Sequence, residues 1–371
     1  MIKHYFTCAN SSKGFQNYFS SNLCGLDKIY ILKGGPGSGK STLMKKVGQM
    51  YHSNNYDVEF IHCSSDVDSL DGVIIRKLGV AIVDGTSPHV IEPIAPGAIE
   101  QYVHLGDAWD IDKLTSNKES ILLLQVEIAN CYSKVYELYA KAKKVHDEWE
   151  NIYIANMDFE AANQLAKKLI ELIFDTTDEV EVDEGYEYHR FFGAPTGNGP
   201  VDFVLGLTDP IQTRYFIKGR PGTGKSSMLR KIVKESVSRG FETEVYHCAF
   251  DPDSLDMVLI PALDVCIFDS TSPHEYFPQR EGDIIVDVYQ EAVEPNTDEK
   301  FEDELKDISS RYRTLTKEAA SYLAKAKCLH DDLEKIYVSA TDFNKVTEIR
   351  KALIGQIQKI QLSKILDANK R

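Results

Sequence analysis

The sequence predicts an α/β protein built from two tandem lobes, each with a mainly parallel β-sheet and a long helical hairpin. The first reason is an internal repeat, because the stretch KGGPGSGKST that starts at Lys33 aligns without a gap with KGRPGTGKSS, which starts at Lys218. The second is that short apolar runs alternate with helical segments in each copy, as in parallel sheets with crossover helices. The third is length, because 371 residues exceed what one hydrophobic core usually organises.

The repeat keeps a constant spacing of 185 residues through its most similar part. The match extends back to His4 and His189, and it resumes after a one-residue slip at His146 and His330. Such self-similarity indicates a duplicated structural unit. The pairs that coincide include His62-Cys63 with His247-Cys248, Asp68–Asp71 with Asp253–Asp256, Asp84 with Asp269, and Thr86–His89 with Thr271–His274.

These copies are predicted to fold as two units, residues 1–184 and residues 185–371, with the boundary in the acidic stretch Asp175–Glu187. Apolar residues in the last third of each unit recur at alternating spacings of three and four, which indicates a long helix. A second helix follows, so we expect helical hairpins at about 112–174 and 296–362. Each hairpin is either a coiled-coil arm for a protein partner or a second copy, or an arm packed within its own chain. The broad apolar stripe favours the second reading, and the oligomeric state stays open.

Each unit is predicted to begin with the same order of strands and one helix. A strand at Asp27–Leu32 ends at a glycine-rich loop, and a helix at Ser41–Met50 leaves that loop. Apolar runs at Val58–His62 and Val80–Val83 indicate two further buried strands. The second unit repeats this order at Thr213–Ile217, Ser226–Ser236, Glu244–His247 and Val265–Phe268.

The composition excludes several classes of protein. A formal net charge of −15 argues against a broad face for nucleic acid. The chain has no run of about 18 apolar residues and no signal-peptide pattern at its start, so we expect no membrane span and a cytoplasmic location. The seven cysteines include no Cys-x-x-Cys pair, which is typical of reduced thiols.

Both glycine-rich loops match the phosphate-binding (P-loop) pattern G-x-x-x-x-G-K-[ST]. Glycines allow the positive φ angles that aim successive backbone N–H groups at a phosphate, and the helix that follows attracts the same anion. The loop lysine, Lys40 or Lys225, would contact the terminal phosphates. The expected nucleotide-binding residues are Gly34, Gly35, Pro36, Gly37, Ser38, Gly39, Lys40, Ser41 and Thr42 in one unit and Gly219, Arg220, Pro221, Gly222, Thr223, Gly224, Lys225, Ser226 and Ser227 in the other.

A magnesium ion is expected beside each loop. Asp84 and Asp269 each end an apolar strand about 44 residues after the loop lysine, as the Walker B aspartate of such proteins does. With Ser41 and Ser226 they would hold Mg²⁺, although a capping aspartate is the alternative. Many ATP hydrolases carry a glutamate directly after this aspartate. Here that position holds Gly85 and Ser270, so the nucleophile needs another carboxylate.

Other candidates for catalysis follow the second and third strands, where ligands bind in such sheets. Asp66 and Asp68, with Asp251 and Asp253, could position or deprotonate a nucleophile, or could form a turn or helix cap. His89 and His274 could stabilise phosphate charge or be ordinary loop histidines. Adjacent His62-Cys63 and His247-Cys248 could bind a metal, but structural roles are favoured.

Arginine usage bears on the kinase alternative. Before Arg190 the chain contains only one arginine, Arg76. Nucleotide kinases clamp phosphates with several arginines, because each guanidinium makes paired contacts. The first unit cannot build such a clamp from its own residues. Arg220, which stands where the first loop has Gly35, is an asymmetry that could tune nucleotide affinity.

Over its whole length the chain resembles a poorly characterised bacterial family of tandem-duplicated P-loop proteins labelled as ATPases or nucleotide kinases. The resemblance rests on KGGPGSGKST, DSLDGVIIRKLGVAIVDGTSPH, KGRPGTGKSS and DSLDMVLIPALDVCIFDSTSPH. It implies binding, and with it hydrolysis, of ATP or another nucleoside triphosphate with Mg²⁺. Three functions therefore stay open: an NTPase that moves its helical arms, a small-molecule or nucleotide kinase, and a nucleotide-stabilised scaffold.

Overall fold

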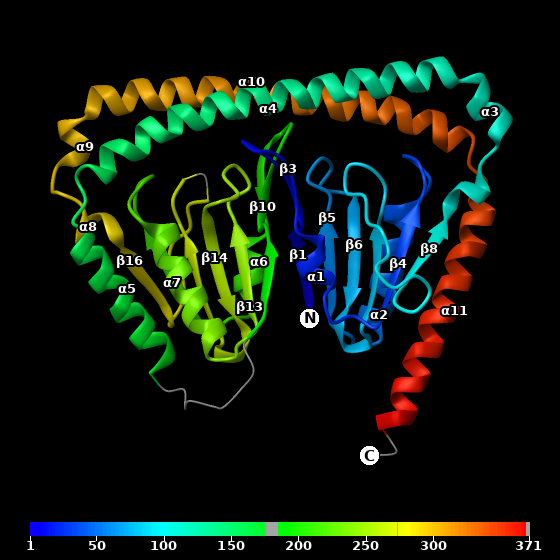
Figure 1. Ribbon diagram of the computed structural model, residues 1–371, viewed down its shortest axis with the longest axis horizontal. Coiled ribbons are helices and arrows are strands. Elements are labelled where there is room, and N and C mark those ends of the chain that lie inside the picture. The colour runs from blue at the N-terminus through cyan, green and yellow to red at the C-terminus, as the bar shows by residue number, and fades with distance from the viewer. Residues whose placement is uncertain (176–184, 273, 369–371) are drawn as a thin grey trace. The chain divides into compact units, whose positions relative to one another are not determined.

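A computed structural model describes residues 1–175, 185–272 and 274–368 and contains two similar lobes of a sheet with helices (Figure 1). The chain clusters into two compact units. The first lobe contains Met1–Cys8, Leu23–Ser133 and Tyr322–Arg371, and the second contains Ala9–Asn22 and Lys134–Ser321. These units divide the chain differently from the sequence repeats at 1–184 and 185–371. Most of the expected boundary, residues 176–184, lies outside the described residues.

The first lobe has a six-stranded sheet in the order β1-β5-β6-β7-β4-β8. All neighbours pair in parallel except β6, which is antiparallel to both β5 and β7. The α/β class with mostly parallel strands is therefore confirmed, and the sheets are mixed. The strands are β1 (Ile2–Phe6), β4 (Lys28–Lys33), β5 (Val58–His62), β6 (Leu70–Ile75), β7 (Val80–Asp84) and β8 (Glu100–His104).

The second lobe repeats this sheet in the order β9-β13-β14-β15-β12-β16, with β14 as the antiparallel strand. Its strands are β9 (Glu187–Arg190), β12 (Thr213–Lys218), β13 (Thr243–His247), β14 (Leu255–Ile260), β15 (Val265–Asp269) and β16 (Asp283–Asp287). Two small hairpins, β2–β3 (Cys8–Ser11 and Gly14–Asn17) and β10–β11 (Gly193–Thr196 and Gly199–Asp202), complete the described strands.

The segment before β6 is a turn, so the turn that was one alternative for Asp66 and Asp68 is observed and the helix cap is not. The Asp66 carboxylate accepts hydrogen bonds from the Asp68 N–H and the Ser69 hydroxyl. This turn reverses the chain, and β6 then returns between two strands. Its six residues are all buried, and such a run can be helix or strand on periodicity alone.

The glycine loops lead into α2 (Lys40–Ser53) and α7 (Lys225–Ser238), which cover the sheets through apolar faces. Leu43, Met44 and Val47 of α2 belong to the first-lobe core. Met228 and Ile232 of α7 belong to the second-lobe core in the same way. The sequence predicted both helices, because their apolar periodicity and their position directly after a glycine loop indicate the same element.

The two long helices each cross from one lobe to the other. The helix α4 (Lys118–Ile154) begins in the first lobe, and its residues from 134 onward belong to the second. The helix α10 (Glu302–Ser339) begins in the second lobe and, from 322 onward, belongs to the first. Each crossing delivers the following helix, α5 (Phe159–Phe174) or α11 (Phe343–Ala368), to the sheet of the other sequence repeat.

The delivered helices are part of the cores that receive them. Leu353 and Ile357 of α11 pack in the cluster formed by β4 to β7 and α2. Leu169 and Ile173 of α5 pack in the second-lobe cluster. The expected hairpins are therefore wrong in one respect: α5 packs on α7 and on α8 (Val288–Ala292), and α11 packs on short turns of the first lobe, rather than folding back along the preceding long helix. Within the described residues, no helix is both long and apolar enough to span a membrane.

Ile357→Ala should destabilise the first lobe, because Ile357 is fully buried although it lies in the second sequence repeat. Truncating a buried isoleucine costs about 2–5 kcal/mol of the free energy of unfolding. Hydrogen exchange should accelerate in β4 and β7. Ile365→Ala on the same helix is the matched control, because Ile365 is 47% exposed. If hydrogen exchange became faster only in the second-lobe strands, the packing of α11 in the first lobe would be contradicted.

Candidate functional site

The two glycine loops, Gly34–Ser41 and Gly219–Ser226, have the same backbone shape. Gly37 and Gly39 have φ angles of 65° and 86°, and Gly222 and Gly224 both have 80°. Other residues rarely adopt such angles, so these positions need glycine. The loop also folds tightly on itself, because a Cβ at Gly34 would lie 2.7 Å from the Ser38 hydroxyl oxygen. The observed curve is the kind that directs backbone N–H groups inward.

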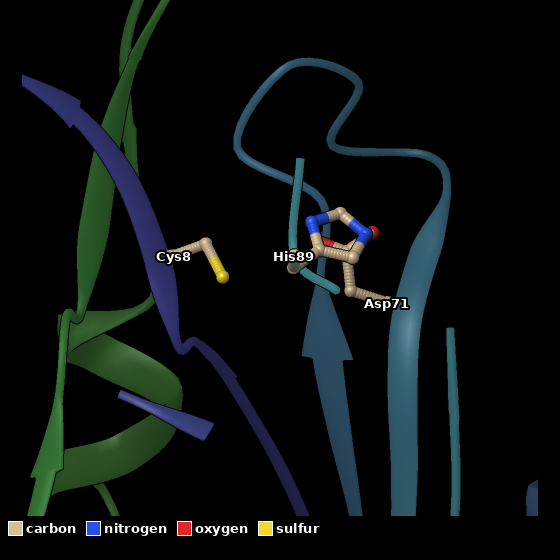
Figure 2. A group of neighbouring side chains, drawn as sticks. All are labelled: Cys8, Asp71 and His89. Atoms are coloured by element: carbon tan, nitrogen blue, oxygen red, sulfur yellow. The ribbon is translucent and has the colours of Figure 1, made fainter. Parts of the chain in front are cut away.

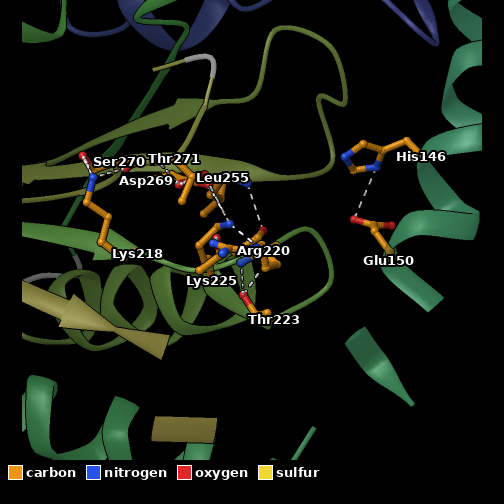
Figure 3. Close-up of polar contacts among 12 residues, drawn as sticks. His146, Glu150, Lys218, Arg220, Thr223, Lys225, Leu255, Asp269, Ser270 and Thr271 are labelled. Carbon is orange, nitrogen blue, oxygen red and sulfur yellow. Dashed lines mark hydrogen bonds and ion pairs between the residues drawn. The ribbon is translucent and has the colours of Figure 1, made fainter. Parts of the chain in front are cut away.

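The loop lysine lies beside the aspartate that ends the neighbouring strand. Lys40 Nζ donates to the carbonyl oxygens of Gly34 and Gly35, both at 2.8 Å, and lies 3.5 Å from Asp84 Oδ2. Strand pairing sets this distance, since Leu32 at the end of β4 is in register with Asp84. The second lobe repeats the pair, with Lys225 Nζ 3.3 Å from Asp269 Oδ2 (Figure 3).

The expected magnesium ligands sit close by but already have protein partners. The Ser41 hydroxyl accepts a hydrogen bond of 3.0 Å from the Leu70 N–H at the start of β6, and Ser226 accepts one of 2.9 Å from Leu255. Asp84 Oδ1 accepts from the backbone and the hydroxyl of Thr86. Both carboxylates keep their Oδ2 atoms toward the loop lysines. The side chains of Thr42 and Ser227, also expected at the nucleotide, are exposed on the helices.

A second carboxylate lies near each lysine–aspartate pair, buried in the first lobe and partly buried in the second, and the sequence reasoning did not select it. Asp71 and Asp256 are the second aspartates of the repeated Asp-Ser-Leu-Asp segments. Burial raises the pKa of both, and the charges of Asp84 and Asp269 add to the effect. For Asp256 the pKa is raised to about 7. The signal that could have revealed them is their recurrence in both copies at the edge of the sheet.

The candidate histidines contact these buried carboxylates or a neighbouring one. His89 Nε2 lies 3.6 Å from Asp71 Oδ1, and both side chains are buried. His274 Nδ1 is hydrogen-bonded to Asp202 Oδ2 at 2.7 Å. Burial lowers the pKa of His274, but the hydrogen bond that it donates to Asp202 and the charges of nearby carboxylates outweigh burial, so its pKa is raised. Pro273, in the same motif, lies outside the described residues.

The first lobe adds a thiol to this buried group. Cys8, Asp71 and His89 offer ligand atoms that lie within 4.8 Å of one another, and Figure 2 shows Cys8 extending toward the other two side chains. Burial raises the pKa of the Cys8 thiol well above its ordinary value, which favours the neutral form. At the spacing of the repeat, Gly193 stands in place of Cys8, so the second lobe lacks this thiol.

The four candidate aspartates after the second strand fall into two kinds. Asp66 and Asp251 lie inward, and each faces a lysine of a long helix: Asp66 Oδ2 is 3.4 Å from Lys327 Nζ, and Asp251 Oδ2 is 3.5 Å from Lys143 Nζ. Asp68 is exposed, and Asp253 is 69% exposed and paired with Lys13. The structure therefore separates the members of each pair.

Each glycine loop also contacts the end of a long helix. A Cβ at Gly35 would lie 2.7 Å from Tyr337, and one at Gly37 would lie 2.8 Å from Glu334 Cγ and 2.9 Å from its carbonyl oxygen. In the second lobe, a Cβ at Gly222 would lie 2.5 Å from the carbonyl oxygen of Glu150. In both lobes the helix comes from the other sequence repeat, which the sequence reasoning did not anticipate.

These helix ends share the pattern Lys-x-x-His-Asp-x-x-Glu, at Lys143–Glu150 and Lys327–Glu334. We call these stretches the helix segments. Burial lowers the pKa of His146 to about 4, and the positive charges of Lys143 and Lys225 act in the same direction. Figure 3 shows His146 and Glu150 from α4 in the same view as Lys225 and Asp269. Burial raises the pKa of Glu150.

The second lobe has a pocket of about 610 Å³ beside its glycine loop. Arg220 lines it and is held by Asp298, with Arg220 Nη2 2.8 Å from Asp298 Oδ2. Trp149 and Tyr153 supply aromatic surface, and the remaining positive charges come from α10. Arg220 thus distinguishes this loop from the first, as the sequence suggested. The basic side chains in the lining are Arg220, Lys306, Arg313 and Lys317.

The His-Cys pairs that follow the second strand have structural contacts. His62 Nδ1 donates to the Val67 carbonyl at 2.6 Å, and its Nε2 is 2.7 Å from His4 Nδ1. His247 makes the corresponding contacts with Pro252 and His189. Both ring nitrogens of His62 and His247 are therefore occupied by protein partners, which favours the structural reading over a metal site.

Comparison with models of protein families, with curated proteins and with solved structures gave no match.

Stability should fall as the pH drops from about 6.5 to about 4. Burial lowers the pKa of His62 and of His247 to about 4, whereas the ordinary value is 6.5. The unfolded chain therefore binds more protons in this window, and each unit of pKa difference corresponds to about 1.4 kcal/mol. Urea unfolding across this range should show the loss, and His62→Gln with His247→Gln should reduce its slope. His52→Gln, on an exposed histidine, should not, and equal slopes for both would refute this origin.

Proposed function

We propose that the protein binds two nucleoside triphosphates, one at each glycine loop, and hydrolyses them, with ATP as the first candidate. The observation that carries this proposal is the pairing of a loop lysine with a strand-end aspartate at two glycine loops of the same shape. Glycines with positive φ, a helix that begins at the loop lysine and a largely shielded lysine together suit a polyphosphate. The expected binding partner of each loop is therefore a nucleotide.

The residues around each loop also suit a magnesium ion. Serine hydroxyl and aspartate carboxylate oxygens are the ligands that Mg²⁺ prefers. Ser41 with Asp84, and Ser226 with Asp269, would hold it together with phosphate oxygens. When bound, the ion would neutralise charge on the phosphates. Ser41 Oγ retains its own proton and a lone pair after accepting from Leu70, so its bond to β6 does not prevent this role.

Asp66 and Asp251 are the best candidates to position the attacking group. Each follows the second strand of its sequence repeat and faces a lysine of a long helix, Lys327 or Lys143. Asp71 is buried and Asp256 is partly buried, and we assign both to holding the surrounding side chains. The contacts between each loop and a long helix give a physical route by which nucleotide binding could move the helical arms.

A kinase is the second candidate, and the pocket beside Arg220 favours it. Its volume of about 610 Å³ falls within the usual range of ligand pockets. A lining with four basic side chains suits an anionic acceptor. Phosphate release from ATP alone, compared with transfer to anionic metabolites and nucleotides, separates the two functions.

Lys40→Ala and Lys225→Ala should each remove one nucleotide site, because each lysine lies in one loop only. Titration calorimetry with Mg²⁺ and ATP should give two sites in the natural protein and one in each variant. The matched controls are Lys46→Ala and Lys234→Ala, on exposed lysines of the same helices. A stoichiometry of two in either loop variant would refute the assignment.

Asp251→Asn in a Lys40→Ala protein should slow turnover at the remaining site by about 10²–10⁴-fold, as expected when a positioning group is lost. Affinity for ATP should change little. Asp253→Asn is the matched control, because Asp253 faces solvent and pairs with Lys13. Equal rates for the two variants would mean that the nucleophile is positioned by other groups or comes from a bound acceptor, which would favour the kinase.

A further inference from the structure

We propose that Lys143 and Lys327 contact the terminal phosphate of the bound nucleoside triphosphate, each at the glycine loop of the other sequence repeat. The lysine of α4 would serve the second-lobe loop, and the lysine of α10 the first-lobe loop. This inference rests on the proposed function and adds the residues that distinguish a triphosphate from a diphosphate.

The spacing of the helix segments places their polar residues together. In Lys-x-x-His-Asp-x-x-Glu the polar positions are i, i+3, i+4 and i+7, which share one face of a helix. The same four residue types recur at Lys143–Glu150 and Lys327–Glu334. A helix face that is only in contact with solvent would not need the same four residue types in both copies, since charged residues on such a face can replace one another. The recurrence indicates that both copies use the face in the same way.

Contacts hold this face against the loops. The glutamate at the end of each segment, Glu150 or Glu334, touches the glycine at the same position of the loop, Gly222 or Gly37. Neither glycine could carry a side chain without moving the helix. Lys143 Nζ is 3.7 Å from Glu150 Oε2 and so lies next to the residue that contacts the loop.

The lysines are cations held by carboxylates that face the site. Lys143 pairs with Asp147 and Glu150 of its own helix and with Asp251 of the sheet edge. Burial lowers the pKa of Lys143, but these carboxylates outweigh burial and raise it, so the side chain stays charged. Lys327 is similarly held by Asp331 and Asp66. A phosphate near Asp251 or Asp66 would meet an ammonium group that a small rotation could release.

The site needs such a cation. The terminal phosphate of a triphosphate gathers negative charge, and enzymes of this chemistry place positive groups around it. Arg76 is the one arginine of the first repeat. Its Nε and Nη2 atoms donate to Glu59 Oε1 and Oε2 at 2.5 Å and 3.0 Å, so it is engaged elsewhere. Lys33 is directed to the carbonyl oxygens of Gly85 and Ile91. Lys40 lies in the loop itself, and Lys327 would supply a further positive charge there.

The test compares affinities for a triphosphate and a diphosphate. In a Lys40→Ala protein, which keeps only the second-lobe site, Lys143→Ala should reduce the preference for β,γ-imido-ATP over ADP by about 10–100-fold, as for loss of a hydrogen bond to a charged group. ADP affinity should stay within about threefold, and Lys143→Arg should restore most of the preference. In a Lys225→Ala protein, Lys327→Ala should have the same effect on the first-lobe site.

Lys141→Ala and Lys325→Ala are the matched controls, because Lys141 is 56% exposed and pairs with Glu137, and Lys325 is exposed. Lys143→Gln keeps a long polar side chain, so this second variant separates the loss of the positive charge from a folding defect. An unchanged preference, or an equal loss of both nucleotides, would overturn the inference while leaving the proposed function intact. If the natural protein binds neither nucleotide in calorimetry, the proposed function fails and the inference fails with it.

Discussion

The close approach of a long helix to each glycine loop is the constraint on which the rest of the site depends. At Gly37 and Gly222 there is no room for a Cβ, because backbone and side-chain atoms of Glu334 or Glu150 occupy that space. The same glycines have positive φ, so two independent demands coincide at one position. A larger residue would both strain the loop and push the helix away. The backbone shape of the loop and the docking of the helix are therefore linked in a single residue of each lobe.

That link is possible because the long helices change lobe. At 1.5 Å per residue, the 37 residues of α4 extend about 55 Å, and those from 134 onward belong to the unit built around the other sheet. The next helix completes the receiving core through Leu169 and Ile173, or Leu353 and Ile357. Neither sequence repeat can bury its apolar surface alone. Folding of one lobe consequently requires a segment from the other repeat.

The sequence could predict the elements and the local chemistry but not this exchange. The loops, their helices and the strands that end at Lys33 and Asp84 follow from local pattern, and register alone brings Lys40 to Asp84. By contrast, Leu169 and Leu353 occupy equivalent positions of the repeat, so the apolar face of α5 would suit either sheet. Local periodicity contains no information about which copy a helix joins. The strand β6 was missed for a similar reason, since a short, fully buried run does not distinguish strand from helix.

The same reasoning explains why the absence of a glutamate after Asp84 and Asp269 does not by itself argue against hydrolysis. A search along the sequence looks for the missing group next to the strand, because that is where a site made from one repeat would carry it. In a site made from two repeats, charged groups can come from a helix that is more than 70 residues away along the chain, as Lys143 and Glu150 are from Lys225. Gly85 also leaves no space for a side chain at that position, since a Cβ there would lie 2.3 Å from Ile31 Cγ2. In the first lobe, packing at the strand end thus excludes the usual location, so a positioning carboxylate would have to come from another element of the site.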